Sequence, residues 1–161
     1  MVSCVFPGSF DPVTKGHTDL ILRASRLFDH VTVTVMYNIY KKGAIPVEKR
    51  LELLRRACSA WTNVSVDSWN GLLADYMRDK KEKIIIRGVR SSAEYEQELT
   101  ACEANRILNS EAETVFIPSS PTMAGISSSA VREIAAFGGN IEAFVPEGLT
   151  EEIAALLSKK V

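Results

Sequence analysis

The segment at residues 8–17 (GSFDPVTKGH) constrains the fold of this chain more than any other part of its sequence. It follows a short apolar run at residues 2–6, which is typical of a buried β-strand and ends at Pro7-Gly8. After the segment, apolar residues recur at the spacing of an amphipathic helix: Leu20, Ile21, Ala24, Leu27 and Phe28. The pattern predicts a strand, a glycine-containing loop and a helix in direct succession.

A helix that begins here offers an anion-binding site at its N-terminus, because its first N–H groups lack partners and carry about half a positive charge. Gly16 lets the backbone approach a ligand closely, and His17 falls in the first helical turn. The helix N-terminus disfavours a charged imidazole, so we expect His17 to act either as a neutral hydrogen-bond donor or as a cation induced by phosphate. Neither Gly-x-x-x-x-Gly-Lys-Ser/Thr nor Gly-x-Gly-x-x-Gly occurs in the chain, which leaves Thr14-x-Gly16-His17 as the candidate phosphate motif.

Strands and helices are predicted to alternate along the whole chain. Runs of apolar and β-branched residues predict strands at 31–37, 63–68, 83–86 and 114–117. Amphipathic patterns predict helices after Pro46 and at 72–78, 93–108, 128–137 and 149–157. The run at 83–86 is apolar enough to be covered on both faces, as in a central parallel strand. We therefore expect one α/β domain spanning residues 1–161, with a doubly wound, five-stranded parallel sheet.

The composition of the chain argues against several classes of binding partner. The net charge of −1 and the pI near 6.2 argue against binding to nucleic acid or to an anionic membrane surface. Cys4, Cys58 and Cys102 contain no Cys-x-x-Cys pair, which favours reduced thiols in the core and no zinc site. The first residues lack a basic region and a signal-like apolar stretch, and no apolar run reaches transmembrane length, so we expect a cytoplasmic protein.

Polar residues follow four of the predicted strands. In open parallel sheets, ligands bind beyond the carboxyl ends of the strands. The segments found there are residues 9–17, Lys41-Lys42, Arg87-Gly88-Val89-Arg90, and a serine-rich loop that reaches Ser127-Ser128-Ser129 and Arg132. Each alone has an ordinary explanation, since surface cations are solvated and serines cap helices. Together on one edge, they predict a site for a triphosphate and a second phosphorylated ligand.

Three of these motifs also carry a resemblance to a known family. Thr14-x-Gly16-His17, Arg87-Gly88-Val89-Arg90 and Ile126-Ser127-Ser128-Ser129-x-x-Arg132 resemble the nucleotidyltransferase superfamily, and within it the bacterial phosphopantetheine adenylyltransferases. The resemblance implies a Rossmann-like nucleotidyltransferase fold and the reaction of ATP with 4′-phosphopantetheine to give dephospho-coenzyme A and pyrophosphate. It also implies Mg²⁺ carried by the ATP phosphates without a protein metal site, feedback inhibition by coenzyme A, and a homohexamer.

The resemblance further implies roles for individual residues. Catalysis is assigned to His17, Lys41 and Arg90. The acceptor is assigned to Ser9, Lys41, Leu73 and Arg87, with Leu73 against the pantetheine arm. The residues assigned to ATP are Ser9, Phe10, His17, Gly88, Val89, Arg90, Glu98, Met123, Ala124, Gly125, Ile126, Ser127, Ser128 and Ser129. Two positions depart from the family pattern: Ser9 replaces a common threonine but keeps the hydroxyl, and Met123 replaces a frequent aromatic residue.

The expected chemistry agrees with these residue types. A phosphate monoester is already an anionic nucleophile at neutral pH, so the acceptor needs no general base and can attack in line, without a covalent intermediate. The protein must bring two polyanions together and stabilise charge at the α-phosphorus, a task suited to cations and helix N–H groups. Two alternatives remain open from the sequence: a sister transferase that uses CTP or another acceptor, and a nucleotide-binding sensor without catalysis.

Overall fold

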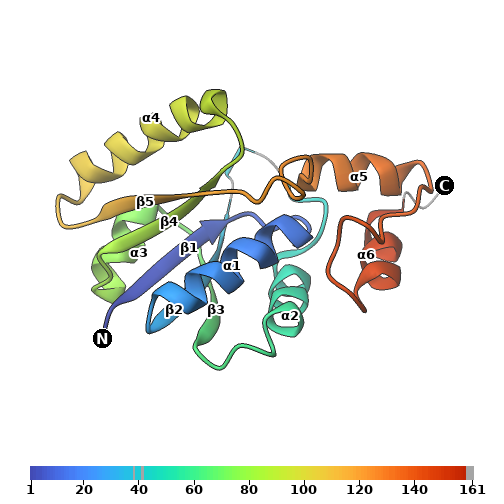
Figure 1. The fold of residues 1–161 in the computed structure, drawn as a ribbon, viewed down its shortest axis with the longest axis horizontal. Coiled ribbons are helices and arrows are strands. Elements are labelled where there is room, and N and C mark those ends of the chain that lie inside the picture. Colours follow the sequence, from blue (N-terminus) through green and yellow to red (C-terminus); the bar gives the residue numbers. More distant parts are fainter. Residues whose placement is uncertain (38, 41, 159–161) are drawn as a thin grey trace.

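The computed structural model of the protein describes residues 1–37, 39–40 and 42–158. Five parallel strands form one sheet in the order β3-β2-β1-β4-β5 (Figure 1). The strands are β1 (Ser3–Gly8), β2 (His30–Met36), β3 (Val64–Trp69), β4 (Ile84–Val89) and β5 (Glu113–Pro118). The helices are α1 (Lys15–Leu27), α2 (Val47–Ala57), α3 (Leu73–Lys80), α4 (Ser92–Leu108), α5 (Ser128–Ala136) and α6 (Thr150–Leu157). The strand order reverses between β1 and β4, which confirms the predicted doubly wound α/β fold.

Alternate residues of β1 face two separate hydrophobic cores. Cys4 and Phe6 pack into the larger core, to which α1, α2, α5 and α6 contribute apolar side chains. Val5 points to the opposite face, where it packs with Tyr76 and Met77 of α3. The central strand is thus buried on both sides, which fits the continuous apolar runs of the sequence.

The predicted cysteine environment is confirmed, because Cys4, Cys58 and Cys102 are all buried free thiols. Over the residues that the structure describes, no helix combines the length and the apolar character needed to cross a membrane.

β1 and β4 are the strands that extend furthest beyond the sequence pattern. β1 continues through Pro7 and Gly8, which stand in register with residues of β2, although this dipeptide was expected to end the strand at residue 6. β4 continues to Val89, so Arg87, Gly88 and Val89 belong to the strand, and Arg90 is the first residue after it. A parallel neighbour holds each extension in the sheet: β2 pairs with Pro7-Gly8, and β5 pairs with residues 87–89. Because Arg87 is part of β4, the sheet fixes the direction in which its side chain projects.

Hydroxyl side chains define the start of three helices that border the carboxyl edge of the sheet. Thr14, Ser91 and Ser127 are the N-cap residues of α1, α4 and α5. Each accepts a hydrogen bond from the backbone N–H three residues later, at 3.3, 3.2 and 3.1 Å respectively. Figure 1 shows α5 and α6 beyond one end of the sheet. The N-termini of α1 and α5 therefore border the region where the sequence predicts a ligand.

Candidate active site

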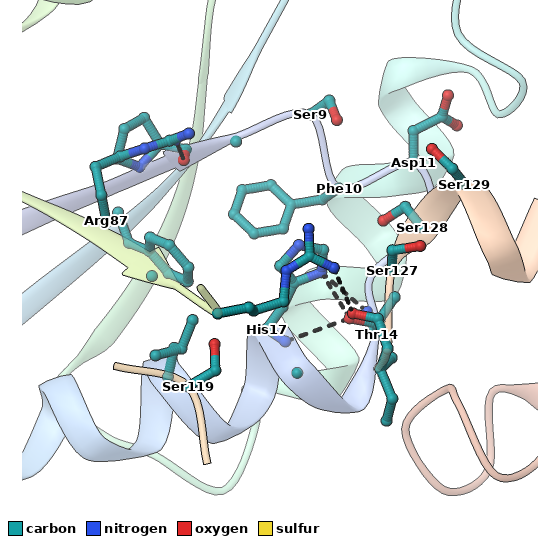
Figure 2. A pocket seen from close by; sticks show the side chains of 18 of the residues that line it. Ser9, Phe10, Asp11, Thr14, His17, Arg87, Ser119, Ser127, Ser128 and Ser129 are labelled. Atoms are coloured by element: carbon teal, nitrogen blue, oxygen red, sulfur yellow. Dashed lines mark hydrogen bonds between the residues drawn. The ribbon is translucent and has the colours of Figure 1, made fainter. Parts of the chain in front are cut away.

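A cavity of about 570 Å³ lies at the carboxyl ends of β1 and β4 (Figure 2). The loop after β1, the end of β4, the first turns of α4 and the N-terminus of α5 all contribute to its walls. Its polar and charged lining residues are Ser9, Asp11, Thr14, His17, Lys42, Arg50, Arg87, Arg90, Glu94, Glu98, Ser119, Ser127, Ser128, Ser129 and Arg132. The structure therefore brings the segments singled out in the sequence to one site.

His17 is held in one orientation by the N-terminal cap of its own helix. Its Nδ1 accepts a hydrogen bond from the backbone N–H of Thr14 at 3.1 Å, and Thr14 Oγ1 lies 3.1 Å from the same nitrogen (Figure 2). Thr14 Oγ1 in turn accepts the N–H of His17, which completes a reciprocal capping box. With Nδ1 acting as an acceptor, the neutral imidazole carries its proton on Nε2. His17 can therefore donate a hydrogen bond from Nε2.

The surroundings of His17 oppose its protonation. Burial lowers the pKa of His17 to about 4, and the positive charges of Arg87 and Arg90 act in the same direction. The ring of Phe10 contacts the imidazole edge-to-face, with centroids 4.9 Å apart. Phe10 takes a left-handed φ of 45°, and its buried ring fixes this unusual backbone beside the histidine. His17 is therefore neutral in the ligand-free protein at neutral pH, mainly because it is buried.

Two of the cavity's arginines, Arg87 and Arg90, are each paired with a carboxylate of α4. Arg87 forms a bidentate pair with Glu98, at 2.6 Å for both contacts, and also donates to the carbonyl of Pro7 at 2.9 Å. Arg90 pairs with Glu94 at 2.6 Å, and this contact holds the pKa of the Glu94 carboxyl below its ordinary value. The resemblance assigns Arg87 to the acceptor and Glu98 to ATP, but in the structure these two residues form one ion pair.

The serine-rich segment ties α5 to the loop after β1. Ser127 caps α5, which is the ordinary role of a serine before a helix. Ser128 donates a hydrogen bond from its hydroxyl to the carbonyl of Pro12 at 2.8 Å. Arg132 donates to the carbonyl of Asp11 at 2.6 Å. Figure 2 shows the three serines on the opposite side of the cavity from Arg87. The N-terminus of α5 thus faces the loop that leads into α1.

A second cavity, of about 680 Å³, adjoins the first. Its walls are mainly apolar and come from β2, β4, the start of α3 and one face of α4; they include Met36, Leu72, Leu73, Ile85, Ala101 and Cys102. Both cavities are lined by Pro7, Gly8, Ser9, Arg87 and Glu98. A polar compartment and an apolar compartment therefore meet at the Arg87–Glu98 pair, and Leu73 lies in the apolar one.

Not every predicted site residue contributes to these walls. Among the described residues, Val89, Ala124 and Gly125 line neither cavity, although Gly88, Met123 and Ile126 line the polar one. Lys41 lies outside the described residues, and its neighbour Lys42 lines the polar cavity.

Sequence reasoning gave no role to three charged residues that line the polar cavity, namely Asp11, Arg50 and Glu94. Arg50 carried one overlooked signal: it occupies the apolar face of a predicted amphipathic helix, where a cation needs a buried partner.

The oriented histidine at a helix N-terminus lies where the strand order reverses, which is the arrangement expected of a nucleotidyltransferase. Residues 5–134 match the cytidylyltransferase-like family. The fold also resembles the solved structure of a putative nicotinate-nucleotide adenylyltransferase from Vibrio parahaemolyticus, with a TM-score of 0.69 over 99% of this chain and 98% of that chain. The two sequences are 14% identical, so this likeness shows the shared fold.

Relatives define the family within this class. The chain is 46% identical over 154 residues to the phosphopantetheine adenylyltransferase of Clostridium perfringens, covering 96% of this chain and 94% of the relative. It is 48% identical over 147 residues to that of Deinococcus radiodurans, with coverages of 90% and 87%. It is 43% identical over 157 residues to that of Streptomyces coelicolor, with coverages of 95% and 98%. The chain belongs to the phosphopantetheine adenylyltransferase family and is an adenylyltransferase, as its motifs predicted.

Proposed function

We propose that this protein transfers the adenylyl group of ATP to 4′-phosphopantetheine, giving dephospho-coenzyme A and pyrophosphate in coenzyme A biosynthesis. The observation that carries the proposal is the junction of the two cavities at Arg87 and Glu98. The polar cavity, with His17 and the N-termini of α1 and α5, suits a triphosphate. The apolar cavity, with Leu73, suits an uncharged arm that ends in a phosphate at Arg87.

The geometry supports direct in-line transfer. An oxygen of the acceptor phosphate bonds to the α-phosphorus of ATP while the bond from that phosphorus to the bridging oxygen of pyrophosphate breaks. His17 serves as a hydrogen-bond donor to the phosphates and not as a nucleophile, because Thr14 engages Nδ1 and the proton resides on Nε2. Arg90 and the N–H groups at the start of α1 and α5 stabilise the developing negative charge.

In the proposed reaction, Mg²⁺ binds as part of the MgATP substrate. The carboxylates of the polar cavity are already engaged: Glu94 and Glu98 pair with arginines, and Asp11 accepts backbone N–H groups. Within the described part of the chain, no group of three or more His, Cys, Asp or Glu residues is arranged to hold a metal ion. This donor set fits an ion ligated by ATP phosphates and water. From the family resemblance we also propose inhibition by coenzyme A, a homohexamer and a cytoplasmic location.

Product analysis tests the proposed function. The purified protein is incubated with ATP, 4′-phosphopantetheine and Mg²⁺, and pyrophosphate release is followed while mass spectrometry detects dephospho-coenzyme A. Parallel mixtures contain CTP in place of ATP, or pantetheine in place of its phosphate. We expect product in the full mixture alone. Turnover with CTP would show a sister transferase, and ATP binding without any product would show a nucleotide sensor.

A further inference from the structure

Asp11 and Arg50 form a buried charged pair beside the polar cavity, and each is only 7% exposed. Asp11 Oδ2 accepts the backbone N–H of Ala44, and Oδ1 accepts that of Ile45, both at 2.8 Å. The carboxylate of the loop after β1 is therefore bound to the backbone of the segment that leads from β2 to α2.

Arg50 makes the same connection from the other side. Its Nε donates to the carbonyl of Ile45 at 2.8 Å, and its Nη1 donates to the carbonyl of Ser9 at 2.9 Å. Nε lies 3.9 Å from Asp11 Oδ1, which places the two charges in contact. A Cβ on Gly43 would clash with the guanidinium, so this glycine lets the backbone close over Arg50. The side chains of Asp11 and Arg50 thus join the two loops through the backbone of each.

The two loops carry different parts of the site. The loop after β1 supplies Ser9 and Phe10 and leads through Thr14 to His17, whereas the segment between β2 and α2 supplies Lys42. Because the Asp11 oxygens and the Arg50 donors named above already have partners within the protein, this pair is arranged to hold the backbone. A buried ion pair by itself adds little net stability, so its main effect is to fix the geometry of the groups that it binds.

We infer that Asp11 and Arg50 are positioning residues for adenylyl transfer, which set the loop carrying Ser9 and Phe10 in register with the segment that carries Lys42. The inference rests on the proposed function. Asp11→Asn replaces one carboxylate oxygen with an NH₂ group that faces a backbone N–H, and this forces the loops apart. A displacement of about 1 Å in a catalytic site can lower the rate by about 100-fold. We therefore expect kcat to fall by about 100-fold while KM for each substrate changes by less than about 3-fold.

The experiment compares the full-length wild-type protein with Asp11→Asn, Arg50→Met, Arg50→Lys and the double variant Asp11→Asn/Arg50→Met. Steady-state kinetics gives kcat and KM for ATP and 4′-phosphopantetheine, and amide hydrogen exchange follows Ala44 and Ile45. Tyr76→Phe is the matched control, because it removes a hydrogen bond of another buried side chain, from Tyr76 to Asp67 at 3.0 Å, at a residue that lines neither cavity.

Positioning predicts a specific pattern of results. The Asp11 and Arg50 single variants lose kcat, the double variant loses little more than either one, and exchange at Ala44 and Ile45 speeds up more than elsewhere. Arg50→Lys keeps the charge but cannot bridge both carbonyls, so it recovers only part of the kcat lost in Arg50→Met. Tyr76→Phe lowers Tm and leaves kcat unchanged.

Two results with the variants overturn the inference alone. The first is a folded Asp11→Asn protein with kcat within about 3-fold of wild type; if that variant does not fold, full kcat in Arg50→Lys has the same meaning. The second is an equal loss of kcat in Tyr76→Phe and in the Asp11 and Arg50 variants when their Tm values fall equally. Reduced stability alone would then explain the loss of kcat. A wild-type protein that forms no dephospho-coenzyme A overturns the proposed function instead, and the inference with it.

Discussion

The unusual environment of His17 makes the stability of this protein depend on pH in a way that one substitution can isolate. The pKa of His17 is about 4 in the folded protein, against an ordinary value of 6.5. Between these values the unfolded chain binds a proton that the folded protein does not. The free energy of unfolding therefore falls as the pH is lowered through this window, and it becomes insensitive to His17 only well above pH 6.5.

The size of the effect follows from the two pKa values. One pKa unit corresponds to about 1.4 kcal/mol, so the His17 contribution to the pH dependence reaches about 3 kcal/mol once the pH is below 4. At pH 5 the loss relative to pH 7 is about 2 kcal/mol. His17→Asn removes this titration and leaves every other ionisable group in place.

Urea unfolding of wild type and His17→Asn at pH 7 and pH 5 measures the difference. We expect the wild-type protein to lose about 2 kcal/mol more than the variant on this acidification. NMR titration of the imidazole in the folded wild type provides the matching pKa directly. Equal losses in the two proteins, or an imidazole that titrates near 6.5, would refute the account of a buried, neutral His17.

Three further predictions concern the cap, the acceptor cavity and the metal. Thr14→Val removes the hydroxyl that caps α1 and should lower the free energy of unfolding by about 1 kcal/mol in urea titrations, whereas Thr14→Ser should stay near wild type. Leu73→Ala removes apolar surface from the second cavity, so KM for 4′-phosphopantetheine should rise about 10-fold with KM for ATP unchanged; equal changes in both would contradict the assignment. Chelation of Mg²⁺ should abolish turnover, and calorimetry should detect no Mg²⁺ binding to the protein without ATP; stoichiometric binding to the protein alone would show a resident site.

The sequence predicted the alternation of strands and helices because each element carries its own periodicity. It failed at the ends of β1 and β4, where Pro7-Gly8 and the segment from Arg87 to Val89 do not look like strand. Pairing with one parallel neighbour, β2 for Pro7-Gly8 and β5 for residues 87–89, overrides the local preference for a turn there. In α4, Cys102 is buried whereas the apolar Ile107 is exposed, because a helix residue is buried only where another element packs on it.

The sequence predicts those parts of the candidate site that come directly after a strand in the chain. The motif around His17 is continuous in sequence, so its position at a helix start could be predicted. The Arg87–Glu98 pair and the Asp11–Arg50 pair join residues from different elements, and nothing in the sequence specifies which carboxylate meets which guanidinium. Those partners emerge only when the sheet brings the loops together.

In the proposed reaction, His17 binds phosphate as a hydrogen-bond donor while the acceptor attacks the α-phosphorus directly. The most direct test is the stereochemical course of the reaction with ATP made chiral at the α-phosphorus by sulfur substitution. Direct in-line transfer predicts inversion of configuration in the dephospho-coenzyme A analogue that forms. Retention would contradict the account, because it would require two displacements and a covalent adenylyl intermediate on the protein.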